Sequence, residues 1–363
     1  MIDFKKHWHC AIACSLFAAS LAGCKHEPPP TPAQQMTKAI QLQDVAAVKQ
    51  LLAQDKALAN APGEETNPPL HRAATLGNVE LARLLIENGA EVNGTGKENP
   101  LLSAAENLHV EMVRLLLEKG ADANVTQPRP HGDIWPMKAA TSGMMSHGGL
   151  ATIPPAEIQK GRAIIGLLLD HGAKPTKPWW HAEVIPAQYC VASIGDLPLL
   201  KRMVQQGFDL QAVQDTDHQT ILHSAASGGN VEVIRWLLDQ GVPVDDESFH
   251  FHWTPLHHAA SSGHLEAVQV LVEEAGCKIN GSGDVQRMRT GTPLHVAINS
   301  GQLEIARFLV QSGADLSLRN EDQLTPLGLA LKRVENAANE KPQPASQKAQ
   351  EIVNFLREQS APE

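Results

Sequence analysis

The sequence predicts an all-α solenoid of about nine helix–turn–helix repeats, and three observations lead to this class. The first is a recurring Pro-Leu-His motif, which begins at Pro69, Pro255 and Pro293. The second is a glycine that recurs, mostly in steps of 31 to 37 residues, at positions 89, 120, 172, 207, 241, 276 and 313. The third is the scarcity of aromatic residues, 4% of the chain, which disfavours a β-sandwich or barrel.

The N-terminal segment has the pattern of an export signal. Two lysines precede an apolar stretch at residues 10–22, which is too short to span a bilayer comfortably. The stretch ends in Leu21-Ala22-Gly23-Cys24, which resembles the bacterial lipobox. This resemblance implies a lipoprotein signal peptide at residues 1–23 and lipidation of Cys24, and the alternative is an ordinary cleaved signal peptide. Lysine rather than aspartate at position 25 favours the outer membrane, with the protein facing the periplasm.

Residues 24–36 are expected to tether the folded body to the lipid. Four of them are prolines, which favour an extended polyproline conformation. At about 3.1 Å per residue, such a tether holds the body up to roughly 35–40 Å from the bilayer. The repeat array is then expected at residues 37–363.

The residues of each repeat suit a pair of short packed helices. Thr254 and Thr292 can cap a first helix, and the proline that follows suits the first helical position, where no hydrogen bond depends on its nitrogen. Leu115 and Leu116 are expected on the buried face of a second helix, and the glycine after that helix is expected in the left-handed conformation. Because so short a pair cannot bury its own apolar face, stacked pairs must share one core.

Three regions depart from the repeat pattern. The first copy, at about residues 37–60, lacks the Thr-Pro-Leu-His motif, and the last contains a polar loop at residues 336–347. Both departures suit the ends of an array, where one face meets water. In the fourth copy, 32 residues separate Ala140 from Gly172, about 17 more than in other copies, which predicts an insertion at about residues 142–158.

Together these motifs resemble the ankyrin repeat, with a Thr-Pro-Leu-His-x-Ala-Ala helix, a second helix and a Gly-Ala-Asp finger. The resemblance covers about residues 37–359. It implies an ankyrin-repeat solenoid with β-hairpin fingers, in which first helices and fingers form a concave protein-binding face. It also implies a hydrogen bond between repeats for the histidines of the motif, which are His71, His223, His257 and His295.

Composition and motifs disfavour several other functions. A net charge of −10 argues against binding to nucleic acid, which needs clustered Lys and Arg. No P-loop or nucleophile elbow is present, and Ser146 beside His147 lacks an orienting carboxylate, so no catalytic residue and no cofactor is expected. Alternating His250 and His252 leave a metal site as an alternative, although a solvated finger is the simpler interpretation and no metal is expected.

Two cysteines remain beside the anchor after residues 1–23 are removed. Cys190 is expected on the first helix of the fifth repeat, and Cys277 in the finger after the seventh. Two stacked repeats separate them by about 20 Å, and a disulfide needs Cα atoms within about 7 Å. We therefore expect free thiols.

Aromatic side chains in and near the fingers are candidate contacts for a partner. Tryptophan and tyrosine dominate binding hot spots, and exposed apolar patches usually mark contacts. The candidate partner-binding residues are Trp135, Trp179, Trp180, His181, Tyr189, Phe249, Phe251 and Trp253. The alternative is that these rings fold back over the enlarged fourth repeat.

The sequence therefore predicts a protein-binding module that is attached to a bacterial envelope membrane only through its lipid and that holds its partner on a rigid, acidic, concave surface. In one version it is a scaffold or accessory protein that holds a resident envelope protein. In another, suggested by resemblance to bacterial ankyrin lipoproteins, it is an immunity protein that neutralises an antibacterial phospholipase effector of type VI secretion. An enzyme and a metal carrier are less favoured.

Overall fold

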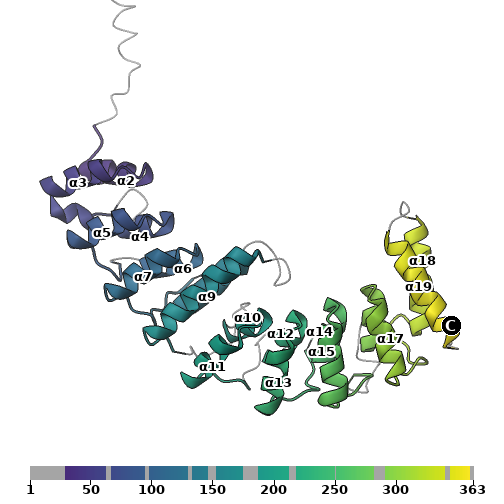
Figure 1. The fold of residues 1–363 in the computed structure, drawn as a ribbon. Coiled ribbons are helices and arrows are strands. Elements are labelled where there is room, and N and C mark those ends of the chain that lie inside the picture. Colours follow the sequence, from purple (N-terminus) through teal and green to yellow (C-terminus); the bar gives the residue numbers. More distant parts are fainter. Residues whose placement is uncertain are drawn as a thin grey trace, which may run out of the picture.

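The computed structural model describes residues 29–62, 67–94, 98–129, 133–145, 153–174, 187–211, 218–249, 251–281, 291–339 and 344–359. Within these ranges the chain forms nine helix pairs and no β-strand, stacked in sequence order into a curved array (Figure 1). The predicted all-α solenoid of nine repeats is confirmed. The expected signal peptide and Cys24 lie outside the described residues.

Each repeat contributes one helix to the inside of the curve and one to the outside. The first helices are α2 (Pro32–Gln41), α4 (Pro69–Leu76), α6 (Pro100–Glu106), α8 (Pro136–Met144), α10 (Ala187–Ser193), α12 (Ile221–Gly228), α14 (Pro255–Ser262), α16 (Pro293–Asn299) and α18 (Pro326–Asn339). The second helices are α3 (Val45–Gln54), α5 (Val79–Glu87), α7 (Val110–Glu118), α9 (Pro155–Asp170), α11 (Leu197–Gln205), α13 (Val231–Asp239), α15 (Leu265–Gln269) with the π-helical turn η4 (Val270–Glu274), α17 (Leu303–Gln311) and α19 (Pro344–Glu358). A 3-10 turn, η1 (Lys56–Ala59), follows α3. First helices such as α4, α6 and α12 lie toward the inside of the curve, and α5, α7 and α13 toward the outside (Figure 1).

The threonine of the repeat motif starts the first helices as predicted. The Thr292 hydroxyl accepts the backbone N–H of His295 at 3.4 Å, while Nδ1 of His295 accepts the backbone N–H of Thr292 at 3.2 Å. This reciprocal pair is a capping box in which histidine replaces the usual glutamate. Pro293 occupies the first helical turn. The motif therefore pairs the backbone N–H groups that have no partner within the helix at its start with its own side chains.

One continuous apolar core runs along the array between the two rows of helices. Leu115 and Leu116 on α7 are fully buried, and so are the paired alanines Ala259 and Ala260 on α14. The glycine after the second helix adopts the predicted left-handed conformation, with φ between 65° and 94° at positions 89, 120, 172, 207, 241, 276 and 313.

In the part of the chain that the structure describes, the fingers differ from the β-hairpins that were expected. In the described residues their only ladder contact is an isolated antiparallel bridge between Gln127 and Ile134. Side chains link successive fingers instead, since Asn93 Oδ1 accepts the backbone N–H of Asp122 at 2.8 Å. An Asn or Asp in a tight turn satisfies backbone donors that a strand would otherwise pair, so strand pairing is unnecessary.

The expected insertion at about residues 142–158 is partly helical. Helix α8 continues to Met144 and α9 begins at Pro155, so both ends of this range extend the helices. Helix α9 has 16 residues, whereas α7 has 9. Gly161 allows α9 to lie directly against Met144, because an added Cβ would collide with that side chain. Residues 146–152, which include Ser146 and His147, lie outside the described part of the chain.

Two expected boundaries are wrong. Helix α2 begins at Pro32 and is capped by Thr31, so the array starts within the stretch 24–36 that was expected to be tether. Proline suits this first helical position, which is why it does not exclude a helix here. At the other end, α18 runs to Asn339 and α19 starts at Pro344, so helices occupy both ends of the expected loop at 336–347.

The seventh repeat contains one extra residue. Its second helix and glycine span residues 265–276, whereas the equivalent stretches in the sixth and eighth repeats span 231–241 and 303–313. The helix absorbs the extra residue as the π-helical turn η4, in which the backbone N–H of Ala275 donates to the carbonyl of Val270 at 3.0 Å.

None of the described helices is long and apolar enough to cross a membrane.

Candidate partner-binding surface

Buried histidines connect each first helix to the next repeat. Their Nε2 atoms face backbone carbonyl oxygens of the next repeat: His223 faces Trp253 at 2.9 Å, His257 faces Gly291 at 3.2 Å and His295 faces Leu324 at 3.0 Å. Nε2 of His71 lies 2.7 Å from the Ser103 hydroxyl, also in the next repeat. The predicted hydrogen bonds between repeats are therefore confirmed. Burial lowers the pKa of His257 to about 3 and that of His295 to about 4, so both rings are neutral and Nε2–H donates.

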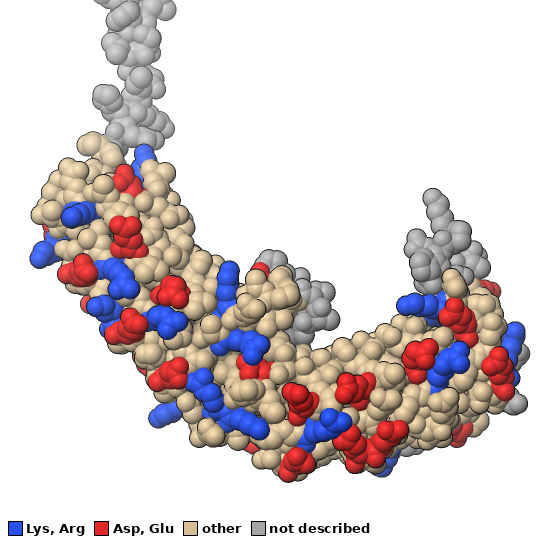
Figure 2. Space-filling model, in the orientation of Figure 1, with Lys and Arg blue, Asp and Glu red and all other residues tan. Residues whose placement is uncertain are grey.

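The first helices of repeats five to eight contain no Asp, Glu, Lys or Arg. Helices α10, α12, α14 and α16 are built mainly from Ala, Ser, Leu, Val and His. The Ser227 and Ser262 hydroxyls of neighbouring helices lie 3.4 Å apart, and Ser262 and Ser300 are exposed. Figure 2 shows the inner edge of the curve largely free of charge, while acidic and basic side chains gather over the second helices. We call the inner surface of these four helices the neutral groove.

A neutral groove of small side chains suits contact with another polypeptide. Small residues permit close approach of a second backbone, and uncharged residues lose little hydration when covered. The depletion of charge is also typical of the centre of protein interfaces.

Two phenylalanines are exposed beside this groove, on the segment 245–253 between repeats six and seven, which we call the aromatic finger. Phe249 is 63% exposed and Phe251 is 44% exposed. The finger is closed at its base, because the backbone N–H of Ser248 donates to the Trp253 carbonyl at 2.8 Å. The Trp253 ring is half-buried and stacks on His257 with centroids 6.1 Å apart. The exposed rings therefore stand on a fixed base.

The other candidate residues behave differently. Tyr189 was expected to contact a partner, but it is fully buried on α10, where its hydroxyl donates to the Gln219 carbonyl at 3.2 Å. Its position on the first helix places its ring between repeats, which corrects that assignment. Trp135 is half-buried at the start of α8, with the Lys138 ammonium 5.2 Å from its ring centroid. Trp179, Trp180 and His181 lie outside the described residues.

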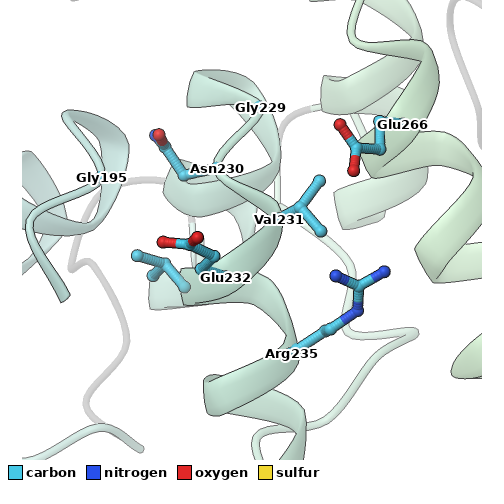
Figure 3. A pocket seen from close by; sticks show the side chains of 8 residues that line it. Gly195, Gly229, Asn230, Val231, Glu232, Arg235 and Glu266 are labelled. Atoms are coloured by element: carbon cyan, nitrogen blue, oxygen red, sulfur yellow. The ribbon is translucent and has the colours of Figure 1, made fainter.

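A shallow depression of about 290 Å³ lies on the outer side, around the start of α13. Figure 3 shows Glu232 and Arg235 on α13 with Glu266 on the neighbouring α15. Arg235 forms a bidentate ion pair with Glu274 at 2.8 and 2.7 Å, and the Asn230 amide donates to the Ser193 carbonyl at 2.6 Å. Arg235 and Asn230 therefore serve contacts between repeats.

The cysteine thiols and the His252 ring are placed in structural contacts rather than in a reactive site. Cys190 and Cys277 are buried free thiols on different repeats, as expected, and burial raises the pKa of each to about 12. His252 Nδ1 lies 3.1 Å from a carboxylate oxygen of Glu247, and His250 lies outside the described residues. Among the residues that the structure describes, no group of three or more His, Cys, Asp or Glu is placed to hold a metal ion.

Two features of this surface were missed by the sequence reasoning. One is the neutral groove, which corrects the expectation of an acidic concave surface, because the first helices α10, α12, α14 and α16 contain no charged residue. The other is the uneven distribution of charge. Residues 210–280 contain ten Asp or Glu and two Lys or Arg, so they carry a net charge of −8 out of −10 for the chain. A count of charge by repeat, and a comparison of first with second helices, would have found both.

Comparisons with known proteins agree with the repeat geometry. The family model for ankyrin repeats in three copies matches residues 36–127 and 188–283, and the model for a single ankyrin repeat matches residues 291–321. The stretch between the first two ranges contains the enlarged fourth repeat. A search of curated proteins finds no match.

Proposed function

Because the chain belongs to the ankyrin-repeat family, we propose that it is a protein-binding module whose partner occupies the concave face of the array. Members of this family are typically interaction scaffolds without catalytic activity. The observation that carries the proposal is the neutral groove on α10, α12, α14 and α16, beside the exposed Phe249 and Phe251. A charge-depleted surface next to exposed aromatic rings has the composition of an interface centre rather than of a solvated surface.

The proposal includes attachment to a bacterial envelope membrane through lipid on Cys24. The Leu21-Ala22-Gly23-Cys24 pattern supports it, as do the prolines that follow. The described chain enters the array at α2, which lies at one end of the curve (Figure 1). A tether leaving from that end keeps the neutral groove accessible.

The binding proposal is tested by adding charge to the groove. A bait of residues 25–363 is compared with the double variant Ser262→Glu/Ser300→Glu in affinity capture from envelope and secreted proteins of the source strain. Ala163→Glu, at an exposed position on α9, is the matched control. We expect a stoichiometric partner that the control retains and the double variant binds at least about tenfold more weakly, because a buried unpaired carboxylate is strongly unfavourable.

The outcome also separates the versions of the function. A resident envelope protein as partner identifies a scaffold or accessory protein, and a lipase-like effector identifies an immunity protein. If the unmodified bait and Ser262→Glu/Ser300→Glu bind the partner equally well, the neutral groove is not the contact surface. Attachment is tested separately: Cys24→Ala should move the protein from the membrane to the soluble fraction, and retention in the membrane would contradict lipidation at this cysteine.

A further inference from the structure

The strongest charge asymmetry of the chain coincides with its aromatic finger. Residues 210–280 carry a net charge of −8, and the finger lies within them. Of the two cations in this stretch, Arg235 is already paired with Glu274 in a bidentate ion pair. The negative potential of repeats six and seven is therefore left largely uncompensated by the repeats themselves.

Carboxylates stand at the start of the aromatic finger. Asp245 uses one oxygen to accept the backbone N–H of Lys278 at 3.0 Å, which fixes its position. Asp246 is half-buried beside it, and burial together with the charge of Asp245 raises the pKa of Asp246. In the described part of the chain, no Lys or Arg side chain forms an ion pair with either carboxylate. A cation brought to this position would relieve the repulsion between them.

The same finger offers apolar area and aromatic faces. Apart from Leu42 in the first repeat, Phe249 and Phe251 are the most exposed large hydrophobic side chains of the described residues. Phe251 packs near Trp253, with ring centroids 5.9 Å apart, so the rings of Phe251 and Trp253 form one aromatic surface. Aromatic faces attract Lys and Arg as well as apolar side chains.

The neighbouring neutral groove supplies no cation. Helices α12 and α14, which flank the finger in sequence, contain no Lys or Arg. Lys278 contacts Asp245 through its backbone N–H, and in the described residues its side chain forms no ion pair with Asp245 or Asp246. A cation of the partner can therefore complement these two carboxylates. A second copy of this chain is a poor occupant, because it would bring the same negative repeats against this surface, and nucleic acid is repelled for the same reason.

We propose that the aromatic finger binds a basic polypeptide segment in which Lys or Arg lies within a few residues of a large apolar side chain. The apolar side chain covers Phe249 and Phe251, and the cation lies against Asp245 and Asp246. The inference rests on the proposed protein-binding function and specifies the chemistry of its partner. Like-charge repulsion then excludes acidic partners, which makes the finger the selective part of the surface.

Three labelled ten-residue peptides test the proposal by fluorescence anisotropy with the intact chain. One alternates Arg and Leu, one alternates Arg and Ser, and one alternates Glu and Leu. We expect the Arg–Leu peptide to bind at least about tenfold more tightly than either of the others, and its affinity to fall as salt rises. Equal binding of the Arg–Leu and Arg–Ser peptides would overturn the role of the rings.

Variants separate the two parts of the site. Phe249→Ser/Phe251→Ser should reduce Arg–Leu binding to the Arg–Ser level, whereas Asp246→Asn should weaken both basic peptides. The matched control is Leu42→Ser, since Leu42 is 69% exposed but lies in the first repeat. Circular dichroism confirms that each variant folds. If Leu42→Ser weakens binding as much as the finger variant, the proposal is wrong.

A capture experiment with the finger variant tests the basic-segment inference separately from the proposed protein-binding function. The finger variant is used as bait in the capture experiment with the groove variants. A partner lost on Ser262→Glu/Ser300→Glu but kept on Phe249→Ser/Phe251→Ser leaves the binding function intact and refutes the basic-segment inference. Loss with both baits supports the two together.

Discussion

Acidification should destabilise the array through its buried histidines. His257 and His295 are fully buried, and their pKa values in the folded chain are about 3 and about 4, against 6.5 for an ordinary histidine. Desolvation is the main cause in both cases. Nδ1 of each ring accepts a backbone N–H from the preceding threonine, at 3.0 and 3.2 Å, so a proton added there would face a donor.

The free energy of unfolding depends on pH because the folded and unfolded chains bind protons with different affinities. Because the folded pKa is the lower one, the unfolded chain takes up protons first as the pH falls below 6.5. The free energy of unfolding is therefore highest above pH 6.5 and falls by about 1.4 kcal/mol per pH unit per histidine until the folded pKa is reached. At about pH 5 each ring accounts for a loss of about 2 kcal/mol, or about 4 kcal/mol for the pair.

Urea unfolding followed by circular dichroism, at about pH 7.5 and about pH 5, measures this loss. His295→Gln should lower stability at the higher pH but reduce the pH-dependent loss by about 2 kcal/mol, because glutamine does not titrate. His171→Gln, at an exposed position, is the control and should leave the loss unchanged. A wild-type loss below about 1 kcal/mol, or the same loss in His295→Gln, would refute the reasoning.

Three further predictions concern packing. Gly143→Ala should lower the free energy of unfolding by about 3 kcal/mol, because a Cβ there collides with a carbonyl of α6. Gly120→Ala, at φ 91° with free space around it, should lower it by only about 1–2 kcal/mol, because alanine adds backbone strain but no collision. Urea unfolding compares the two, and equal losses would contradict this account of α8. Cys190 and Cys277, whose pKa values are raised to about 12, should react with a thiol reagent at pH 8 at least about tenfold more slowly in the folded than in the unfolded chain, and rapid reaction would show that burial is transient. Tyr189→Ala should cost about 3–5 kcal/mol in unfolding experiments while the folded fraction binds the Arg–Leu peptide normally, and a binding defect without destabilisation would restore this residue to the surface.

The repeat register could be read from the sequence because its determinants are local. A capping threonine such as Thr292, the proline after it and the glycine at position 313 act within one helix pair, and each acts on the backbone beside it. The same local chemistry explains the error at the N-terminus. Pro32 suits either a polyproline tether or a first helical turn, and the residues alone do not choose between them.

The surface was harder to predict because exposure depends on neighbours distant in sequence. Tyr189 and Phe251 are both aromatic and both lie near fingers, yet one is covered by the next repeat and the other is 44% exposed. Similarly, histidine Nε2 atoms find carbonyl partners about 30 residues away, which only stacking brings into reach.

The sequence by itself determined the class of fold, the number of repeats and the concentration of negative charge in residues 210–280, since these depend on composition and on interactions within one repeat. Only the tertiary structure decided which of the rings remain in water and where uncharged first helices from four repeats join into one groove. The physical reason is that each helix pair buries its apolar face against its neighbours, so the surface is what stacking leaves uncovered.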